Sequence, residues 1–360
     1  MSVAERERVR EVDAELKVLC LSTAVHPVGV RLERAMNGID GIEVEPADSI
    51  DTAFAALAAG EADLLAAPAD QVHVARQRLE AMDMEVVGAL QRKHPFHVMV
   101  ADDRIDYLRK DAIVLTESRL LRRQMRRRRR GLAIRSFIAF AETEDLTLPD
   151  GELQRFEWLE GLRESGAIDA YIVPRTLYES AGSRNRRHAL TADPEDRGVA
   201  RFMPVPFADL SVLVARRGFP RRLISDWSDE EGETSWVAQN RLLEATPAEL
   251  HDRIGLLVRH RRLSTLLNEA DRLHDLFLID SEIDPEGDVI DDQMRIEIGI
   301  ELISGNGRRT ISVERIQPLD DFTSTIVFLC REWQVYLDES QAPHEESVRL
   351  GPARPPFLDP

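Results

Sequence analysis

Two stretches of the chain, LAAGEADLLAAP (57–68) and LRESGAIDAYIVP (162–174), repeat one local pattern. In each stretch a helix-forming segment ends at a glycine, an aspartate follows three residues later, and four small or apolar residues run to a proline. Glycine is a common residue at helix C-termini, and a short continuous apolar run is typical of a strand buried in a parallel sheet. The pattern therefore predicts one helix–strand unit used twice, in two α/β domains.

Four further apolar runs predict strands: residues 17–23 and 112–118, each leading into a helix, and residues 96–101 and 210–215, which would cross between the domains. We expect a discontinuous first domain of residues 15–101 and 201–222 and a second domain of residues 102–200. Two crossings make a hinge with a cleft between the domains. In open α/β sheets, ligands bind beyond the carboxyl ends of the strands, so the cleft is the expected binding place.

A small third α/β domain is predicted for residues 240–338, after the acidic segment SDEEGET (228–234), which we interpret as a linker. The sequence TPAE (246–249) has the pattern of a capping box and predicts the start of a long helix. Further on, two alternating runs predict a β-hairpin with Asn306–Gly307 at its turn. The tail, residues 339–360, is rich in proline and mixed charge, which is typical of disorder.

The charge balance limits the classes of partner. The chain has 65 Asp and Glu against 47 Lys and Arg, for a net charge of −18, and its only lysines are Lys17, Lys93 and Lys110. An acidic surface keeps a protein soluble where salt screens its charges, so we interpret the acidity as a sign of a salt-adapted (halophilic) source. Because nucleic-acid phosphates would be repelled, no nucleic-acid partner is expected.

Several other functions are not expected. No apolar run approaches the roughly 20 residues of a membrane helix, and the charged N-terminus does not resemble a signal peptide, so we expect no membrane partner and a cytoplasmic location. Cys20 and Cys330 are interpreted as core thiols and not as a disulfide or a CxxC site. The closest histidines, His94 and His97, lie on a predicted strand, and no metal site is predicted.

The stretch TESRLLRRQMRRRRRG (116–131) has eight arginines within twelve positions. On a helix six of them share one face: Arg119, Arg122, Arg123, Arg126, Arg127 and Arg130. Each like-charged i,i+4 pair costs about 0.2–0.5 kcal/mol, so an anion on this face would stabilise the helix. Ser118 is the predicted N-cap, and the free N–H groups behind it also attract anions.

We therefore predict a carboxylate-binding site at Ser118, Arg119, Arg122 and Arg123, where guanidinium groups can bind planar carboxylates. For Arg126 to Arg130 a solvated face, neutralised by the acidic residues of the protein, is the simpler interpretation. Nucleic-acid binding by this run is the last-ranked alternative.

The order of these segments resembles hydroxymethylbilane synthase, also called porphobilinogen deaminase, over roughly residues 17–280. The sequence LRRQ (121–124) matches the end of the family signature Gly-Thr-Ser-Ser-Leu-Arg-Arg-Gln. GEADLLAAPADQV resembles the family's Gly-x-x-Asp-Leu-Ala-Val-His-Ser-Leu-Lys-Asp, and GAIDAYIVPRTLYESAG resembles its Gly-x-x-Asp-Ala-Ile-x-Leu-Ala-x-Ala-Gly-Leu.

The resemblance implies two type II periplasmic-binding-protein-like domains and a small third α/β domain. It also implies a role in tetrapyrrole (porphyrin) biosynthesis, in which four porphobilinogens condense head to tail with loss of ammonia. In the family, the matching arginines hold the carboxylates of a covalent dipyrromethane cofactor and of the growing chain. The implied ligand is therefore a polycarboxylate pyrrole or tetrapyrrole.

Two departures from the family affect its chemistry. The catalytic aspartate aligns with Gln71, which cannot exchange a proton near neutral pH; only a slip of one residue would make Asp70 the acid. The loop that carries the cofactor cysteine corresponds to IDSEIDPEGD (279–288), which has none. We therefore expect no cofactor attachment through this loop, and no cofactor is assured.

Two hypotheses remain. The chain is either a divergent synthase, a transferase that uses Asp70 as its acid, or a non-catalytic anion-binding or partner protein on the same scaffold.

Overall fold

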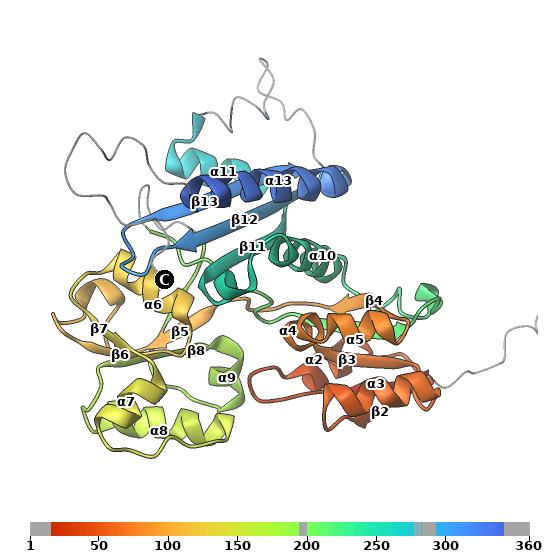
Figure 1. Ribbon diagram of the computed structural model, residues 1–360, viewed down its shortest axis with the longest axis horizontal. Coiled ribbons are helices and arrows are strands. Elements are labelled where there is room, and N and C mark those ends of the chain that lie inside the picture. Colours follow the sequence, from red (N-terminus) through yellow and green to blue (C-terminus); the bar gives the residue numbers. More distant parts are fainter. Residues whose placement is uncertain (1–15, 194–199, 277–278, 280–281, 283–292, 342–360) are drawn as a thin grey trace, which may run out of the picture. The chain divides into compact units, whose positions relative to one another are not determined.

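A computed structural model describes residues 16–193, 200–276, 279, 282 and 293–341 (Figure 1). The chain divides into two compact units, each described by itself below. The first unit comprises Met1–Lys93 and Asp209–Glu233, and the second comprises His94–Ala208 and Thr234–Pro360.

The first unit contains one five-stranded sheet with the order β2-β1-β3-β10-β4. β1 is parallel to β2 and β3, whereas β10 is antiparallel to β3 and β4. The buried side chains of Val18, Leu64, Leu213 and Trp227 belong to its core. Its elements are β1 (Leu16–Cys20), α2 (Val28–Ala35), β2 (Ile42–Pro46), α3 (Ile50–Ala59), β3 (Leu64–Pro68), α4 (Ala69–Val74), α5 (Arg76–Ala81), β4 (Met84–Leu90), β10 (Ser211–Arg216) and the 3₁₀ helix η2 (Arg221–Leu223).

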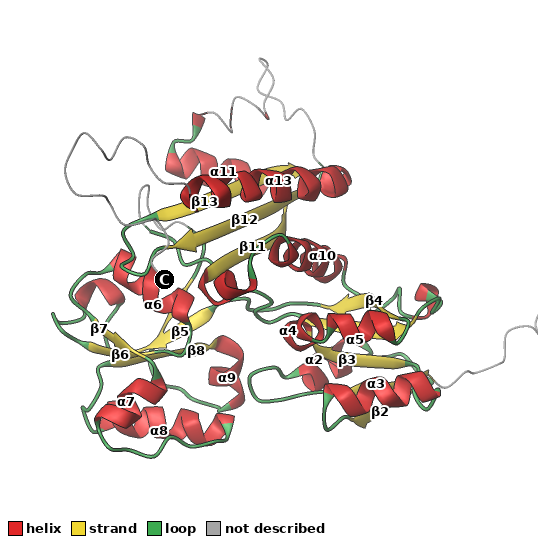
Figure 2. Ribbon diagram, viewed as in Figure 1, coloured by secondary structure: helices red, strands yellow, loops and turns green. Residues whose placement is uncertain are grey.

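The second unit contains a five-stranded sheet with the order β7-β6-β8-β5-β9, in which β5 is antiparallel to both of its neighbours. Helices and strands alternate along this part of the chain, as they do in the first unit (Figure 2). Its elements are β5 (His97–Val100), the 3₁₀ helix η1 (Ile105–Tyr107), β6 (Ile113–Leu115), α6 (Arg119–Arg128), β7 (Ala133–Arg135), α7 (Phe137–Thr143), α8 (Glu152–Glu164), β8 (Ala170–Pro174), α9 (Arg175–Ser180) and β9 (Arg187–Leu190).

The two sheets share one plan. Each has parallel strands on one side and one antiparallel strand, β10 or β5, inserted before the last strand. The predicted α/β class, with one sheet plan used twice, is confirmed, whereas the periplasmic-binding-protein type, the hinge and the cleft stay predictions. The predicted domain boundary at residue 101 is too late, because β5 pairs with β8 and β9 and so lies inside the second unit.

The repeated sequence pattern forms the same local structure twice. Gly60 and Gly166, after α3 and α8, adopt positive φ angles of 77° and 75°. The side chain of Asp63 then accepts a hydrogen bond from the backbone N–H of Lys17 at 3.0 Å, and that of Asp169 accepts one from Ile113 at 2.8 Å. In both cases the aspartate links the start of its own strand to the neighbouring parallel strand.

The second unit also contains a three-stranded antiparallel sheet with the order β11-β12-β13, and α13 packs along β13 (Figure 1). The predicted hairpin is confirmed, with Asn306–Gly307 inside the loop between β12 and β13. The elements of this part are α10 (Glu230–Glu244), the 3₁₀ helix η3 (Ala248–Arg253), β11 (Ile254–Arg261), α11 (Leu263–Leu273), β12 (Arg295–Ile303), β13 (Thr310–Pro318), the 3₁₀ helix η4 (Leu319–Asp321) and α13 (Phe322–Gln341).

Two expectations for this region are wrong, and a third is right only in part. The chain does pass from the first unit to the second within the acidic segment 228–234, but from Glu230 this segment is the first turn of α10 and not a linker without secondary structure. Carboxylates in this turn interact favourably with the helix dipole. The long helix expected after Thr246 is instead η3, β11 and α11, because residues 254–261 pair with β12. α13 extends to Gln341, so residues 339–341 are helical, and the rest of the predicted tail lies outside the described residues.

Both faces of β12 are buried, although their chemistry differs. Ile296, Ile298 and Ile300 form an apolar face, whereas Glu297 and Glu301 project from the other face and are 2% and 5% exposed. Buried carboxylates need cationic partners, since an unpaired buried charge is strongly destabilising. Arginines of the second unit are therefore expected to pair with Glu297 and Glu301 on this face of the sheet.

Candidate functional site

The arginine-rich helix α6 begins where the sequence predicts. The Ser118 side chain accepts a hydrogen bond from the backbone N–H of Leu121 at 3.2 Å, which confirms Ser118 as the N-cap. Leu121 and Met125 are buried in the core of the sheet that contains β6. The helix ends at Arg128, so Arg130 lies beyond the helical face on which it was expected.

The second half of α6 contacts the third sheet and the loop between β12 and β13, although Arg126 is also exposed. Arg126 donates to the carbonyl oxygen of Gly305 at 3.1 Å, and Arg127 forms an ion pair with Glu301 at 2.8 Å. Gln124 donates to the same carboxylate at 2.7 Å. The interpretation of this run as a solvated face is therefore wrong for Arg127, which is 18% exposed and pairs with a buried carboxylate of β12. Arg126 is exposed, as predicted, and its acceptor lies in the loop between β12 and β13.

The end of α6 is held in a similar way. Arg128 forms an ion pair with Asp106, and Arg129 donates to the backbone carbonyls of Asp106 and Leu108. Cationic side chains at a helix C-terminus also interact favourably with the helix dipole. Most of the run thus has structural partners, whereas Arg130 is exposed and has none among the residues that the structure describes.

A pocket of about 490 Å³ lies at the N-terminus of α6; we call it the α6 pocket. Three of the four predicted carboxylate-binding residues line it: Ser118, Arg119 and Arg122. The other lining residues are Glu117, Ser136, Val205 and Asp252. The pocket lies beyond the carboxyl end of β6, the part of an α/β sheet at which ligands usually bind.

The α6 pocket contains both signs of charge. Arg119 forms an ion pair with Asp252 at 3.0 Å, and both side chains are about half exposed, at 55% and 48%. Arg122 donates to the carbonyl oxygens of Thr116 and Glu117 at 3.1 and 3.3 Å. Burial lowers the pKa of Arg122, and Glu117 opposes this shift. An incoming anion would compete with Asp252 for Arg119 while using the remaining donors of Arg122.

Arg123, the fourth predicted residue, does not line the pocket. Its guanidinium group donates to the carbonyl oxygen of Ile303 at the end of β12. Burial, together with the nearby Arg253, lowers its pKa to about 10, so the side chain is still charged at neutral pH. Arg123 therefore connects α6 with the third sheet and is not available to a ligand of the pocket.

Asp70, the candidate catalytic acid, belongs to the first unit. It is the second residue of α4, and its carboxylate lies 3.7 Å from Nε2 of His26. Asp70 Oδ1 and His26 Nδ1 are buried atoms without a hydrogen-bond partner among the described residues. Asp70 and the arginines of α6 therefore belong to different units.

The predicted carboxylate-binding set did not include Glu117, Ser136 and Asp252, which also line the pocket. The sequence position of Glu117 could have indicated it, because Glu117 directly precedes the N-cap of α6. In the structure its carboxylate accepts a hydrogen bond from the Phe137 N–H at 2.7 Å. Asp252 had no signal, because it lies in η3 far along the chain and reaches Arg119 only through the tertiary structure.

Neither cysteine has the properties of a nucleophile. Cys20 is buried, and burial raises the pKa of its thiol to about 11, while burial also raises the pKa of Cys330. Both thiols are therefore protonated at neutral pH. Most of the loop 279–288, which lacks the family cysteine, lies outside the described residues. Within the described part, no group of three or more potential ligands could hold a metal ion, and no helix is long and apolar enough to span a membrane.

The sequence matches no protein-family model and no curated protein. Among solved structures, an ABC transporter from Parabacteroides distasonis is 11% identical, with a TM-score of 0.38, over 96% of this chain and 99% of that chain. The periplasmic aliphatic sulphonate binding protein of Escherichia coli is 11% identical, with a TM-score of 0.34, over 90% and 91%. Similarities this weak carry no argument about function, which has to come from the site itself.

Proposed function

We propose that the chain is a non-catalytic binding protein that holds a small polycarboxylate in the α6 pocket. The observation that carries this proposal is the meeting of Arg119, Arg122 and the N-terminus of α6 at one cavity. The backbone N–H groups of a helix N-terminus and the guanidinium groups all favour negatively charged oxygens. The cavity of about 490 Å³ lies within the range of small-molecule sites.

The proposed ligand class is a pyrrole with two or more carboxylates. Two guanidinium groups line the pocket, so a ligand with two carboxylates can pair with both. The resemblance of residues 121–124 to the synthase signature suggests porphobilinogen, which carries an acetate and a propionate, as the first compound to test. A carboxylate without a pyrrole, such as citrate, separates recognition of charge from recognition of the ring.

Catalysis is left out of the proposal for chemical reasons. The residue that aligns with the family acid is Gln71, and Asp70 lies beside His26 in the first unit. The two thiols have raised pKa values, which disfavours their attack on a pyrrole intermediate. Incubation with porphobilinogen should therefore leave the intact mass of the protein unchanged, and a covalent increase by pyrrole units would contradict the proposal.

Calorimetric titration of the full chain with porphobilinogen tests the binding. The double variant Arg119→Gln/Arg122→Gln should weaken binding about tenfold or more, because hydrogen bonds to charged groups contribute about 1.5–3 kcal/mol. Arg130→Gln is the matched control, since it removes an exposed arginine of the same run that does not line the pocket. Equal affinities for all three proteins would exclude the α6 pocket as the site.

Asp252→Asn gives a test in the opposite direction. Asp252 neutralises Arg119 in the free protein, so its removal should strengthen anion binding about two- to fivefold, the range expected for an exposed ion pair. A purely structural Arg119–Asp252 pair would change the melting temperature of the variant without changing its affinity for the ligand.

A further inference from the structure

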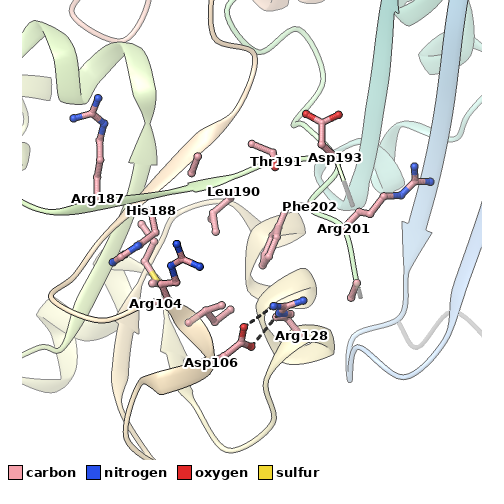
Figure 3. A pocket seen from close by; sticks show the side chains of 14 residues that line it. Arg104, Asp106, Arg128, Arg187, His188, Leu190, Thr191, Asp193, Arg201 and Phe202 are labelled. Carbon is pink, nitrogen blue, oxygen red and sulfur yellow. Dashed lines mark hydrogen bonds and ion pairs between the residues drawn. The ribbon is translucent and has the colours of Figure 1, made fainter. Parts of the chain in front are cut away.

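A second pocket, of about 300 Å³, lies along the free edge of β9 in the second unit; we call it the β9 pocket (Figure 3). It reaches α6 only at Arg128, the last residue of the helix, whereas the α6 pocket surrounds the first turn. A helix of this length spans about 15 Å, so the two pockets are separate.

One part of the β9 pocket is apolar. Met99, Leu190, Phe202 and Ile105 line it, and each of these side chains is at most 8% exposed. In Figure 3, Leu190 and Phe202 lie between the polar side chains of the two ends of the pocket. An apolar ligand group of a few carbon atoms would be removed from water here, and each buried methylene contributes about 0.8 kcal/mol.

Most of the arginines that line this pocket already have partners. Arg128 pairs with Asp106, as the dashed lines in Figure 3 show, and Arg201 pairs with Glu314. The guanidinium group of Arg187 lies over the ring of Tyr178, 4.8 Å from its centre. Carboxylates therefore neutralise Arg128 and Arg201, whereas Arg187 keeps its charge and is held against the Tyr178 ring.

Arg104 is different. Its side chain is exposed, lines the pocket, and forms no ion pair or side-chain hydrogen bond with any residue that the structure describes. In a chain with 65 acidic residues, an arginine without such a partner beside an apolar wall is a cationic group available to a ligand. Its planar guanidinium group suits a single carboxylate.

His188 adds a neutral polar group beside Arg104. Its Nε2 lies 3.2 Å from the carbonyl oxygen of Ala101. Burial lowers the pKa of His188; the hydrogen bond opposes this shift, and the nearby Arg186 and Arg104 add to it. The ring is therefore neutral at pH 7 and donates from Nε2 to Ala101, and Arg104 remains the charged group at this end.

We propose that the β9 pocket binds a small amphipathic monocarboxylate, with Arg104 pairing with the carboxylate and Phe202 and Leu190 covering the apolar part. One carboxylate on the ligand matches Arg104, and the apolar wall selects an amphipathic molecule. Asp106 and Asp193 also line the pocket, but they pair with Arg128 and Arg259 and add no unbalanced charge. The site therefore takes a ligand with an apolar part, unlike the polycarboxylate proposed for the α6 pocket.

Titration of the full chain with hexanoate and with phenylacetate tests this site. At least one acid should bind, while hexanol and 2-phenylethanol, which lack the charge, and citrate, which lacks the apolar part, should bind at least tenfold more weakly to this pocket. Arg104→Gln should weaken binding of the acid about tenfold or more. Arg184→Gln, which removes an exposed arginine of the same unit outside the pocket, should leave binding unchanged.

The double variant Arg119→Gln/Arg122→Gln distinguishes the two proposals. It should bind the monocarboxylate as the parent protein does, whatever the result with porphobilinogen. Loss of monocarboxylate binding in this variant, equal binding by Arg104→Gln and the parent, or no binding of either acid would overturn the proposal. Because Arg104 forms no ion pair or side-chain hydrogen bond with a described residue, the circular dichroism and melting temperature of Arg104→Gln should match those of the parent.

Discussion

At the level of single residues, the arginines of α6 show why a cluster of like charges can be stable in an acidic protein. The side chains of Arg127 and Glu301 are 18% and 6% exposed, and the carboxylate also accepts a hydrogen bond from Gln124. Removing one partner would leave the other buried and unpaired, which is far more costly than the repulsion between neighbouring arginines. The role of each arginine therefore follows from its ion-pair or hydrogen-bond partner in the folded chain, and not from the spacing of the arginines in the sequence.

Gly307 sets how closely the hairpin approaches α6. Its φ angle is +69°, and an added Cβ would lie 3.0 Å from both the carbonyl oxygen of Arg123 and the backbone nitrogen of Arg127. We predict that Gly307→Ala lowers the free energy of unfolding by about 2–5 kcal/mol, because backbone strain costs about 1–2 kcal/mol and overpacking about 1–3 kcal/mol. Urea denaturation followed by circular dichroism measures this loss.

Gly38→Ala is the control for Gly307→Ala, since Gly38 has a φ angle of +85° and no atom within 4 Å of the added Cβ. It isolates the cost of strain, which should be about 1–2 kcal/mol. If both variants lose the same amount, the hairpin does not approach α6 as closely as the structure indicates.

At the level of elements, the repeated aspartates explain why a pattern of a dozen residues was informative. Asp63 and Asp169 each accept a hydrogen bond from the first residues of the neighbouring strand, so their position after the glycine is required by strand pairing. Arg109 also binds Asp169, at 2.6 and 3.0 Å. Burial alone would raise the pKa of Asp169, but the bonds from Arg109 and Ile113 outweigh it and lower the pKa.

This shift predicts a pH dependence. A carboxyl group whose pKa is lower in the folded state stabilises the fold fully above its unfolded pKa, about 3.9, and loses that contribution as the pH falls through the folded value. Asp169→Asn should therefore lower the free energy of unfolding by about 1 kcal/mol at pH 7, and the difference from the parent should shrink below about pH 4. Denaturant titrations of both proteins from pH 3 to 7 measure this difference in the free energy of unfolding.

The exposed Asp150→Asn is a suitable comparison, because no side-chain hydrogen bond or ion pair of Asp150 is present in the described part of the chain. Its unfolding free energy should follow that of the parent at every pH. A constant difference between Asp169→Asn and the parent from pH 3 to 7 would show that the charge of Asp169 contributes nothing.

Elements with a local signal could be predicted, and those defined by distant pairing could not. The repeat, the N-cap at Ser118 and the turn at Asn306–Gly307 depend on neighbouring residues, and the structure contains all three. β11 was missed because its run of apolar residues fits a buried helix as well as a strand, and only pairing with β12 decides. The partners of Arg119 and Arg127, Asp252 and Glu301, lie far along the chain and gave no signal.

For the whole molecule, the division into two units has consequences for unfolding. Each unit has its own buried core, one around Val18 and Leu213 and the other around Val114 and Met125. Each also has a buried ion pair. In the first unit Asp209, which has a φ angle of 57°, forms an ion pair with Arg31 and accepts a hydrogen bond from the Lys93 backbone N–H at 2.8 Å. The chain leaves this unit after Lys93 and re-enters it at Asp209, so the hydrogen bond connects the two crossing points.

We predict two calorimetric transitions, each of which responds to one matched variant. Asp209→Asn and Glu301→Gln each neutralise a buried carboxylate without changing its size, and asparagine tolerates the positive φ angle at position 209. Because each variant leaves a largely buried guanidinium group without its carboxylate, each should cost about 3–5 kcal/mol, but only in its own unit. Asp209→Asn should lower one melting temperature and Glu301→Gln the other. A single transition that both variants shift equally would mean that the two cores unfold as one cooperative body, because destabilising either unit would then destabilise the whole chain.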